Sequence, residues 1–196
     1  MFITAPDEGA AEGEVADWYE QQRASWGYLP NYAPAFATRP DVAAAWNQLN
    51  GAIRGGMDRR RYEVATIAAA RALRSTYCMA AHCKFLRDQC DDETTMRTIA
   101  ADPSGATLDA TDRAIMDFAA QVATDATTVT AEDVDRLRAQ GLDDGDVVSI
   151  VFAAAARSFF TKVLDGLGVQ ADAELGETFD SDVRQQVTVG RPIATS

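Results

Sequence analysis

Apolar residues recur every three or four positions along most of the chain, which is the spacing that places them on one face of an α-helix. No strand-like alternation of apolar and polar residues runs for long. The fold class is therefore predicted to be all-α. Helices are expected at residues 14–26, 40–54, 58–73, 76–88, 111–123, 131–139 and 144–164, with one short helix within 91–111.

Capping residues support several of these boundaries. Pro40 suits the first turn of a helix, and the Thr130–Asp133 segment has the pattern of a capping box. Residues 1–175 are predicted to form a single all-α domain. The β-branched residues that follow show no helical period, so residues 176–196 are expected to be an extended C-terminal tail.

Two segments of the chain are similar to each other. Residues 63–70 resemble residues 146–153, and at the same offset Cys78 matches Thr161. This similarity indicates either a degenerate internal two-fold repeat of a helical pair or the shared Ala-rich composition of two helices.

Charge excludes some classes of partner. The chain has 30 acidic and 18 basic residues and a formal net charge of −12. A surface that binds nucleic acid or anionic lipid needs clustered Lys and Arg, and the only dense basic run is 59–61. We therefore expect no nucleic-acid and no membrane partner. Residues 59–61 are expected to form a solvated helix start or oligomer salt bridges rather than to contact substrate.

The N-terminal residues and the cysteine count bear on the compartment. The first 18 residues lack a basic segment followed by an apolar one, so no secretory signal is visible, and the apolar stretch 147–156 is too short to span a bilayer. Three cysteines are too few, and odd in number, for a disulfide framework. We expect a cytoplasmic protein with reduced thiols.

The candidate chemistry lies in residues 75–83. His82 is the only histidine, and Cys78 stands four positions before it, so a helix would place both on one face. If Ser75 is the N-cap, Cys78 lies in the first turn, where the helix dipole and a nearby imidazole favour a thiolate. The alternative is that Cys78 is an ordinary buried core residue. Cys78, His82 and Cys83 cannot converge on a metal from one helix, so neither a metal nor another cofactor is expected.

This segment resembles the alkylhydroperoxidase D-like, or carboxymuconolactone decarboxylase-like, family, and most closely its peroxidase-related branch. The family pattern is Glu, eleven residues, then Cys-x-x-Cys-x-x-x-His, and here Glu63, Ser75, Cys78 and His82 have the same spacing. Tyr77 stands where the family commonly has a tyrosine. The motif helices cover about 58–90. The resemblance extends over roughly residues 26–172, through Gly-Tyr-Leu-Pro-Asn, Arg-Pro and Thr-Ala-Glu-Asp-Val segments.

The resemblance implies an all-α fold and a homo-oligomer, such as a dimer, trimer or hexamer. It assigns Cys78 as the thiolate that attacks a peroxide, with His82 and Glu63 relaying protons. Ser75 replaces the family's first cysteine, so an external thiol would have to resolve the oxidised Cys78. On one straight helix Glu63 and Cys78 would lie about 22 Å apart. A break near residues 74–77, or a neighbouring subunit, must close that distance.

The sequence is compatible with three functions. The first is a thiol-dependent peroxidase that reduces a small hydroperoxide. The second is a non-redox decarboxylase, isomerase or hydrolase in which Glu63 and His82 do acid–base work on an organic acid or lactone. The third is a catalytically silent oligomer. The aromatic residues Trp26, Tyr28, Tyr32 and Phe36 are expected in the core or an interface rather than in a pocket.

Overall fold

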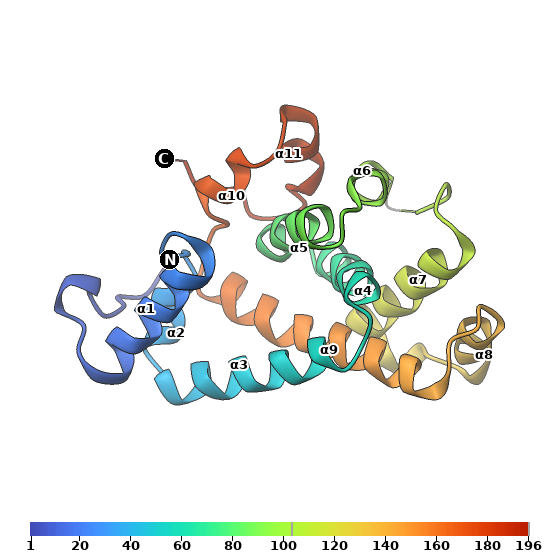
Figure 1. The fold of residues 1–196 in the computed structure, drawn as a ribbon, viewed down its shortest axis with the longest axis horizontal. Coiled ribbons are helices and arrows are strands. Elements are labelled where there is room, and N and C mark those ends of the chain that lie inside the picture. Colours follow the sequence, from blue (N-terminus) through green and yellow to red (C-terminus); the bar gives the residue numbers. More distant parts are fainter. Residues whose placement is uncertain (103, 196) are drawn as a thin grey trace.

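The computed structural model describes residues 1–102 and 104–195, and every regular element within them is a helix (Figure 1). This confirms the all-α prediction. The helices are η1 Glu8–Ala10, α1 Gly13–Trp26, α2 Ala33–Ala37, α3 Pro40–Gly55, α4 Arg59–Ala72, α5 Thr76–Gln89, α6 Glu93–Ala101, α7 Ala110–Asp125, η2 Ala126–Thr128, α8 Ala131–Ala139, α9 Asp144–Gly166, α10 Ala173–Glu177 and α11 Ser181–Val187.

Helix α4 lies at the centre of the fold. Its residues 62–70 are all buried, and it packs against α5, α7 and α9. Four of those residues are alanine, whose small side chain lets neighbouring helices approach closely. A helix that is buried on every side needs no polar face. The one charged residue in this buried stretch, Glu63, therefore requires a specific partner.

Side-chain caps fix several helix starts, among them the capping box that the sequence predicts at Thr130–Asp133. Asp58 caps α4 by accepting a hydrogen bond from the Arg61 N–H, and Thr130 and Asp133 form the capping box of α8. Asp143 caps α9 with a second capping box. Each of these caps satisfies backbone N–H groups that have no partner within the helix.

A sharp turn separates α4 from α5. Arg74 has a φ of 57°, a left-handed conformation that is uncommon for residues with a side chain. The Ser75 N–H then bonds to the Ala70 carbonyl at 2.9 Å, and the chain doubles back. At the offset of the internal similarity, residues 74 and 75 correspond to residues 157 and 158, which lie within the uninterrupted helix α9. The turn that follows the first of the two similar segments therefore has no counterpart after the second.

The C-terminal prediction is wrong. Residues 176–196 were expected to be an extended tail, but in the described part, 176–195, α11 packs against α5 and α6 and buries Val183 and Val187. These two valines are four residues apart, so they share a helix face. Beyond α11, Gly190 passes so close to the Arg74 carbonyl that any side chain would collide with it. The C-terminal segment therefore covers the α4–α5 turn.

Helix α9 is the longest element. By length and composition alone it could cross a membrane, and no other described helix could. Half of its most apolar window is buried inside the fold, where it contacts α4 and α7. This buried half accounts for part of its apolar character, whereas Val148, Phe152 and Phe159 are exposed.

Candidate active site

The α4–α5 turn brings Glu63 and His82 together. Glu63 lies on α4 and His82 on α5, and the His82 Nδ1 to Glu63 Oε2 distance is 2.6 Å. Both side chains are buried, Glu63 completely. The expected break in the helix therefore does close the distance along the chain, within a single copy of the protein.

The contacts of His82 determine its tautomer. Arg157 Nη1 lies 3.0 Å from His82 Nε2, and a guanidinium can only donate. Nε2 is therefore the acceptor, and Nδ1 carries the proton that is donated to Glu63. Burial lowers the pKa of His82 below its ordinary value, although the Glu63 carboxylate acts in the opposite direction. The ring is thus neutral in this arrangement.

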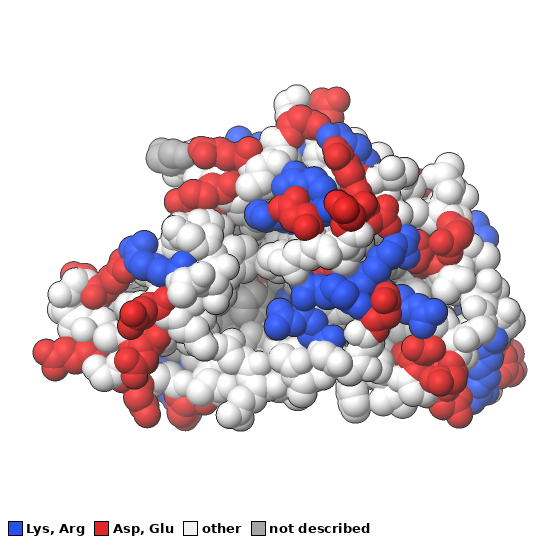
Figure 2. Space-filling view, in the orientation of Figure 1, with Lys and Arg blue, Asp and Glu red and all other residues white. Residues whose placement is uncertain are grey.

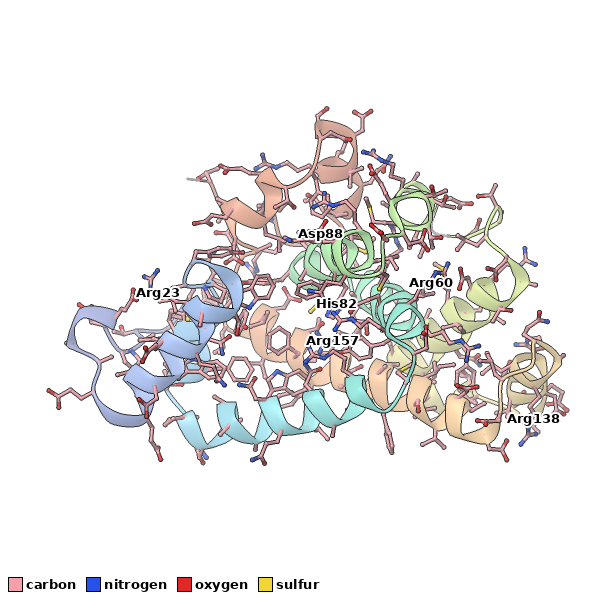
Figure 3. All side chains as sticks on the ribbon, in the orientation of Figure 1. Arg23, Arg60, His82, Asp88, Arg138 and Arg157 are labelled. Atoms are coloured by element: carbon pink, nitrogen blue, oxygen red, sulfur yellow. The ribbon has the colours of Figure 1, made fainter. Side chains whose placement is uncertain are left out.

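Arg157 of α9 connects the imidazole with the thiol. Its Nη1 lies 3.9 Å from Cys78 Sγ as well as 3.0 Å from His82, and its Nη2 donates to Asn50 Oδ1 at 3.2 Å. The side chain is only 4% exposed and has no ion pair with any described carboxylate. Figure 3 shows Arg157 and His82 next to each other between α5 and α9.

Cys78 has two hydrogen-bond donors at its sulfur. Thr161 Oγ1 is 3.5 Å from Sγ, and Arg157 approaches from the same helix, α9. Ser75 caps α5 by accepting from the Cys78 N–H at 3.5 Å, which puts Cys78 at the third helical position. A cation, a hydroxyl and the positive end of a helix dipole would all stabilise negative charge on this sulfur.

These groups border a cavity of about 390 Å³. Figure 2 shows the surface hollowed at the centre of this face, with basic side chains beside the hollow. Cys78, His82 and Arg157 are buried and line its floor, and Arg54 lies at the exposed rim. Aromatic rings cover much of the wall: Trp26, Tyr32, Trp46, Tyr62, Tyr77, Phe85 and Phe160.

The other two predicted site residues have structural contacts. Ser75 is the α5 N-cap described above. The Tyr77 hydroxyl donates to Asp172 Oδ2 at 2.6 Å, and Asp172 also accepts from Tyr28 and from the Asn31 N–H. Burial, and then the Asp172 charge, raise the pKa of Tyr77 well above its ordinary value. The Tyr77 ring therefore faces the cavity, while its hydroxyl binds Asp172. Through Asp172 it connects α5 with Tyr28 and Asn31, in the segment that follows α1.

Cys83 and Cys90 are distinct from Cys78. Burial raises the pKa of the Cys83 thiol to about 12 and also raises that of Cys90. Neither residue lines the cavity, and no disulfide joins the described cysteines. No cluster of His, Cys, Asp and Glu suited to a metal is present in the part of the chain that the structure describes.

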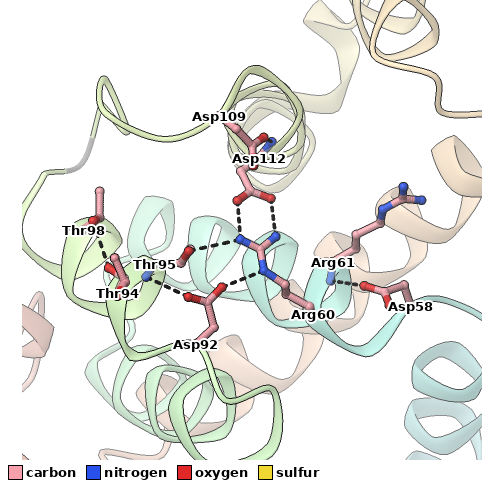
Figure 4. A network of polar contacts seen from close by, with 9 residues as sticks. All are labelled: Asp58, Arg60, Arg61, Asp92, Thr94, Thr95, Thr98, Asp109 and Asp112. Carbon is pink, nitrogen blue, oxygen red and sulfur yellow. Dashed lines mark hydrogen bonds and ion pairs between the residues drawn. The ribbon is translucent and has the colours of Figure 1, made fainter.

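The three consecutive arginines have different environments. Arg60 pairs with Asp92 and Asp112 and donates to Thr95, and Arg61 pairs with Asp146 (Figure 4 shows the Arg60 network). These are salt bridges within one chain. Arg59 differs, because its Nε is 2.7 Å from Glu63 Oε1 and it lines the cavity.

Two expectations, on the environment of residues 59–61 and on that of the aromatic residues 26–36, were thus partly wrong. Arg59 belongs to the site rather than to a solvated helix start. Trp26 and Tyr32 line the cavity, whereas Phe36 is in the core and stacks on Phe160.

The roles of Arg157 and Asn50 and the sulfur contact of Thr161 were not predicted from the sequence. Arg157 and Asn50 lie 79 and 28 positions from Cys78 in the sequence, and neither belongs to a motif. The one signal available was the internal similarity, which matched Thr161 to Cys78. Those two side chains do meet in the fold.

The site and the all-α fold define a class of protein with a thiol and an imidazole beside a cavity. Comparison with known families agrees: residues 40–105 match the model of the carboxymuconolactone decarboxylase family. The predicted resemblance to the alkylhydroperoxidase D-like and carboxymuconolactone decarboxylase-like family is therefore confirmed. None of the curated protein sequences matches this chain.

Solved structures share the fold over almost the whole chain. The alkylhydroperoxidase AhpD core of an uncharacterized peroxidase-related protein from Ralstonia eutropha JMP134 is 23% identical, with a TM-score of 0.79 over 89% of this chain and 93% of that one. An uncharacterized peroxidase-related protein from Silicibacter sp. TM1040 is 22% identical, with a TM-score of 0.76 over 88% and 93%. A cysteine-to-alanine variant of the debrominase Bmp8, in complex with 2,3,4-tribromopyrrole, is 15% identical, with a TM-score of 0.70 over 95% and 96%. At these identities the similarity establishes the fold.

Proposed function

We propose that this protein is a thiol-dependent peroxidase that reduces a small organic hydroperoxide at Cys78. One observation carries the proposal. Among the described residues that line the cavity, Cys78 is the only cysteine, and its sulfur lies within reach of both the Arg157 guanidinium and the Thr161 hydroxyl. A reactive thiol needs groups that stabilise the thiolate and a route for the substrate. Cys78 has the stabilising groups and, although only 1% exposed, it lines the cavity through which a substrate would reach it.

The neutral His82 can accept the thiol proton. Arg157 Nη1 lies near both Nε2 and Sγ, so a small shift toward the sulfur frees Nε2 and brings the cation closer to the developing thiolate. The imidazolium that forms is stabilised by Glu63 at Nδ1. Glu63 and His82 thus act as one proton relay, and Arg157 exchanges its contact with His82 Nε2 for a closer contact with Cys78 Sγ.

The redox step then balances in two stages. The Cys78 thiolate attacks the outer peroxide oxygen, the O–O bond breaks, and the leaving alkoxide takes the proton from His82 to become an alcohol. Cys78 becomes a sulfenic acid. A first external thiol forms a mixed disulfide with release of water, and a second regenerates Cys78 as an external disulfide forms. Ser75 cannot supply the resolving sulfur, which is why an external thiol is required.

The setting of this activity is part of the same proposal. The protein would act as a homo-oligomer in the cytoplasm, where a low-molecular-weight thiol pool is available as reductant. The three unpaired cysteines and the absence of a resolving cysteine at position 75 are consistent with that compartment.

The test is selective oxidation of Cys78. Fully reduced protein is treated briefly with tert-butyl hydroperoxide in the presence of dimedone, and the labelled peptides are quantified by mass spectrometry. Cys78 should be labelled rapidly, and Cys83 and Cys90 should not. Cys83→Ser is the matched control and should label as the wild type does. Equal slow labelling of all three cysteines would contradict the proposal.

The similarity to a debrominase favours a second candidate on the same site. The cavity wall is largely aromatic, as would suit a small haloaromatic ring, and the thiolate could attack a ring halogen. The carbon–halogen bond then breaks, the ring carbon takes a proton, and a sulfenyl halide forms on Cys78. External thiol would release halide and give a mixed disulfide. Halide release from 2,3,4-tribromopyrrole with excess thiol, lost in Cys78→Ser, would favour this candidate over the peroxidase.

The acid–base alternative predicts a different pattern. There Cys78→Ser would keep its activity and His82→Ala would lose it. In the structure Glu63 and His82 each contact an arginine, Arg59 and Arg157, so a substrate that meets either base would have to take the place of that arginine. The peroxidase step needs only a shift of Arg157 from His82 toward Cys78.

A further inference from the structure

The cavity has a charge opposite to that of the protein. Acidic residues outnumber basic ones in the chain by 30 to 18, but the described cavity lining contains Arg54, Arg59 and Arg157 and neither Asp nor Glu. Figure 2 shows basic side chains gathered beside the hollow, whereas acidic ones dominate elsewhere on this face. Such a field concentrates anions at the cavity.

Little of this positive charge is neutralised by the chain itself. Arg59 shares Glu63 with His82, while Arg54 and Arg157 have no ion pair with any described carboxylate. Arg157 is nearly inaccessible and its Nε has no hydrogen-bond partner. A buried guanidinium without a counterion is costly, so the site is electrostatically incomplete when empty.

Two separate anions would complete it. The Cys78 thiolate lies beside Arg157 on the floor and would neutralise that charge. Two arginines remain for a ligand, Arg54 and Arg59. Arg54 is at the exposed rim, and Arg59 is held between the rings of Tyr62 and Phe85. An anionic group at the rim therefore leaves the other end of the ligand pointing toward the sulfur.

We propose that the cavity selects substrates that have a carboxylate at one end and their reactive group at the other. The carboxylate would pair with Arg54, whose planar fork suits bidentate binding, with Arg59 adding charge. The aromatic wall formed by Trp26, Trp46 and Phe85 would contact an apolar body. Where the reactive group is a hydroperoxide, this proposal rests on the proposed function; the binding of the acid does not.

Binding is measured on fully reduced wild-type protein, which keeps Cys78 beside Arg157, and with probes that have no peroxide group, so no turnover takes place. The probes are 3-phenylpropanoate and its neutral amide. Their binding is measured by calorimetry and by the change in fluorescence of Trp26 and Trp46. The acid should bind about tenfold more tightly than the amide, and added salt should weaken the acid alone. Equal affinity for acid and amide, or no binding of either, would overturn the proposal.

Two arginine variants separate a specific contact from general charge. Arg54→Gln should remove the preference for the acid, and Arg54→Lys should retain part of it. Arg113→Gln is the matched control, because Arg113 is also exposed and has no ion pair among the described residues but lies on α7 outside the cavity. Loss of the preference in Arg113→Gln would mean that net charge, not the site, attracts the acid.

Kinetics distinguish this proposal from the proposed function. A carboxylate-bearing aryl hydroperoxide is compared with its methyl ester as substrate. Arg54→Gln should raise KM for the acid about tenfold, and it should raise KM for the ester much less. If neither hydroperoxide is reduced, the peroxidase proposal fails while the binding result stands. If both are reduced equally well by wild type, the carboxylate proposal fails while the peroxidase proposal stands.

Discussion

Single side chains decide which charge states this site can adopt. Arg157 lies against both Cys78 and His82, so it disfavours a second positive charge on the imidazole and favours a negative one on the sulfur. Trp46 and Phe160 flank its guanidinium, at 5.5 and 5.2 Å from the ring centres. Such rings hold the planar group in place without neutralising it.

Replacing Arg157 should slow the reaction of Cys78 with electrophiles. In Arg157→Gln the sulfur loses its neighbouring cation, and the second-order rate of iodoacetamide alkylation at pH 7 should fall about tenfold or more, since a charge-assisted contact is worth about 1.5–3 kcal/mol. Arg157→Lys should fall less. The same measurement on Arg113→Gln provides the control, and an unchanged rate in Arg157→Gln would show that the cation does not act on the sulfur.

The buried His82 should make stability depend on pH. Burial lowers its folded-state pKa below 6.5, so between the two values the unfolded chain binds a proton that the folded chain does not. Stability should therefore rise with pH across this window, by at most about 1.4 kcal/mol per pH unit, and level off above 6.5. The free energy of unfolding is measured with urea for wild type and for His82→Gln between about pH 5 and 8. Because His82 is the only histidine, the difference between the two proteins at each pH isolates its effect. If the two free energies change with pH in parallel, the prediction is contradicted.

The residues that sequence could predict are those with fixed spacing. Cys78 and His82 share a helix face because they are four apart, and a break near Arg74 was required to bring Glu63 to them. Arg157 could not be predicted in the same way, because its contact with His82 joins residues 75 positions apart and depends on how α9 packs against α5. Helix period and caps are local properties, whereas the packing of two distant helices is not.

Among elements, the α4–α5 hairpin brings Glu63, Cys78 and His82 together, and α3 and α9 complete the site. The periodicity and capping signals located both helices to within a few residues, because each cap acts on its own first turn. The same approach failed for α10 and α11. They have five and seven residues, too few for a period to stand out, and their helicity depends on packing against α5 and α6.

The start of α5 offers a gain-of-function test. Ser75 is the N-cap and Cys78 the third helical residue, the relative positions of the family's two cysteines. Ser75→Cys should therefore let Cys78 be resolved within the chain. One equivalent of tert-butyl hydroperoxide should then remove two free thiols, counted with Ellman's reagent, where wild type without added thiol loses one.

Its control is Ser75→Ala. This variant removes the cap, which should cost about 1 kcal/mol of stability, but adds no sulfur and should lose one thiol as wild type does. If Ser75→Cys also loses only one thiol, the N-cap position does not reach the sulfenic acid, and the α5 start is not a vestige of a disulfide site.

At the scale of the whole molecule, one face stands out as apolar. Seven large apolar side chains are exposed among the described residues, and apart from those of residues 1–3 all lie on α3 or α9. They are Leu49, Val148, Phe152 and Phe159, which we term the α3–α9 stripe. In a chain of charge −12 such a stripe is a strong candidate for contact with a second copy. Phe159 also packs against Trp46 of the cavity wall, with ring centres 5.2 Å apart, so that contact would adjoin the site.

We therefore expect the α3–α9 stripe to form the oligomer interface. Phe152 is 54% exposed, so Phe152→Asp should leave the fold intact while placing a buried, unpaired charge in any interface that covers it. Sedimentation should show an oligomer for wild type and a monomer for this variant. Phe2→Asp is the control, because Phe2 is equally apolar and 73% exposed but lies outside the stripe, and it should sediment as wild type does. A monomeric wild type, or an oligomer that survives Phe152→Asp, would contradict this assignment.

Since Phe159 contacts Trp46, the monomer should also show altered tryptophan fluorescence, which links assembly to the shape of the cavity.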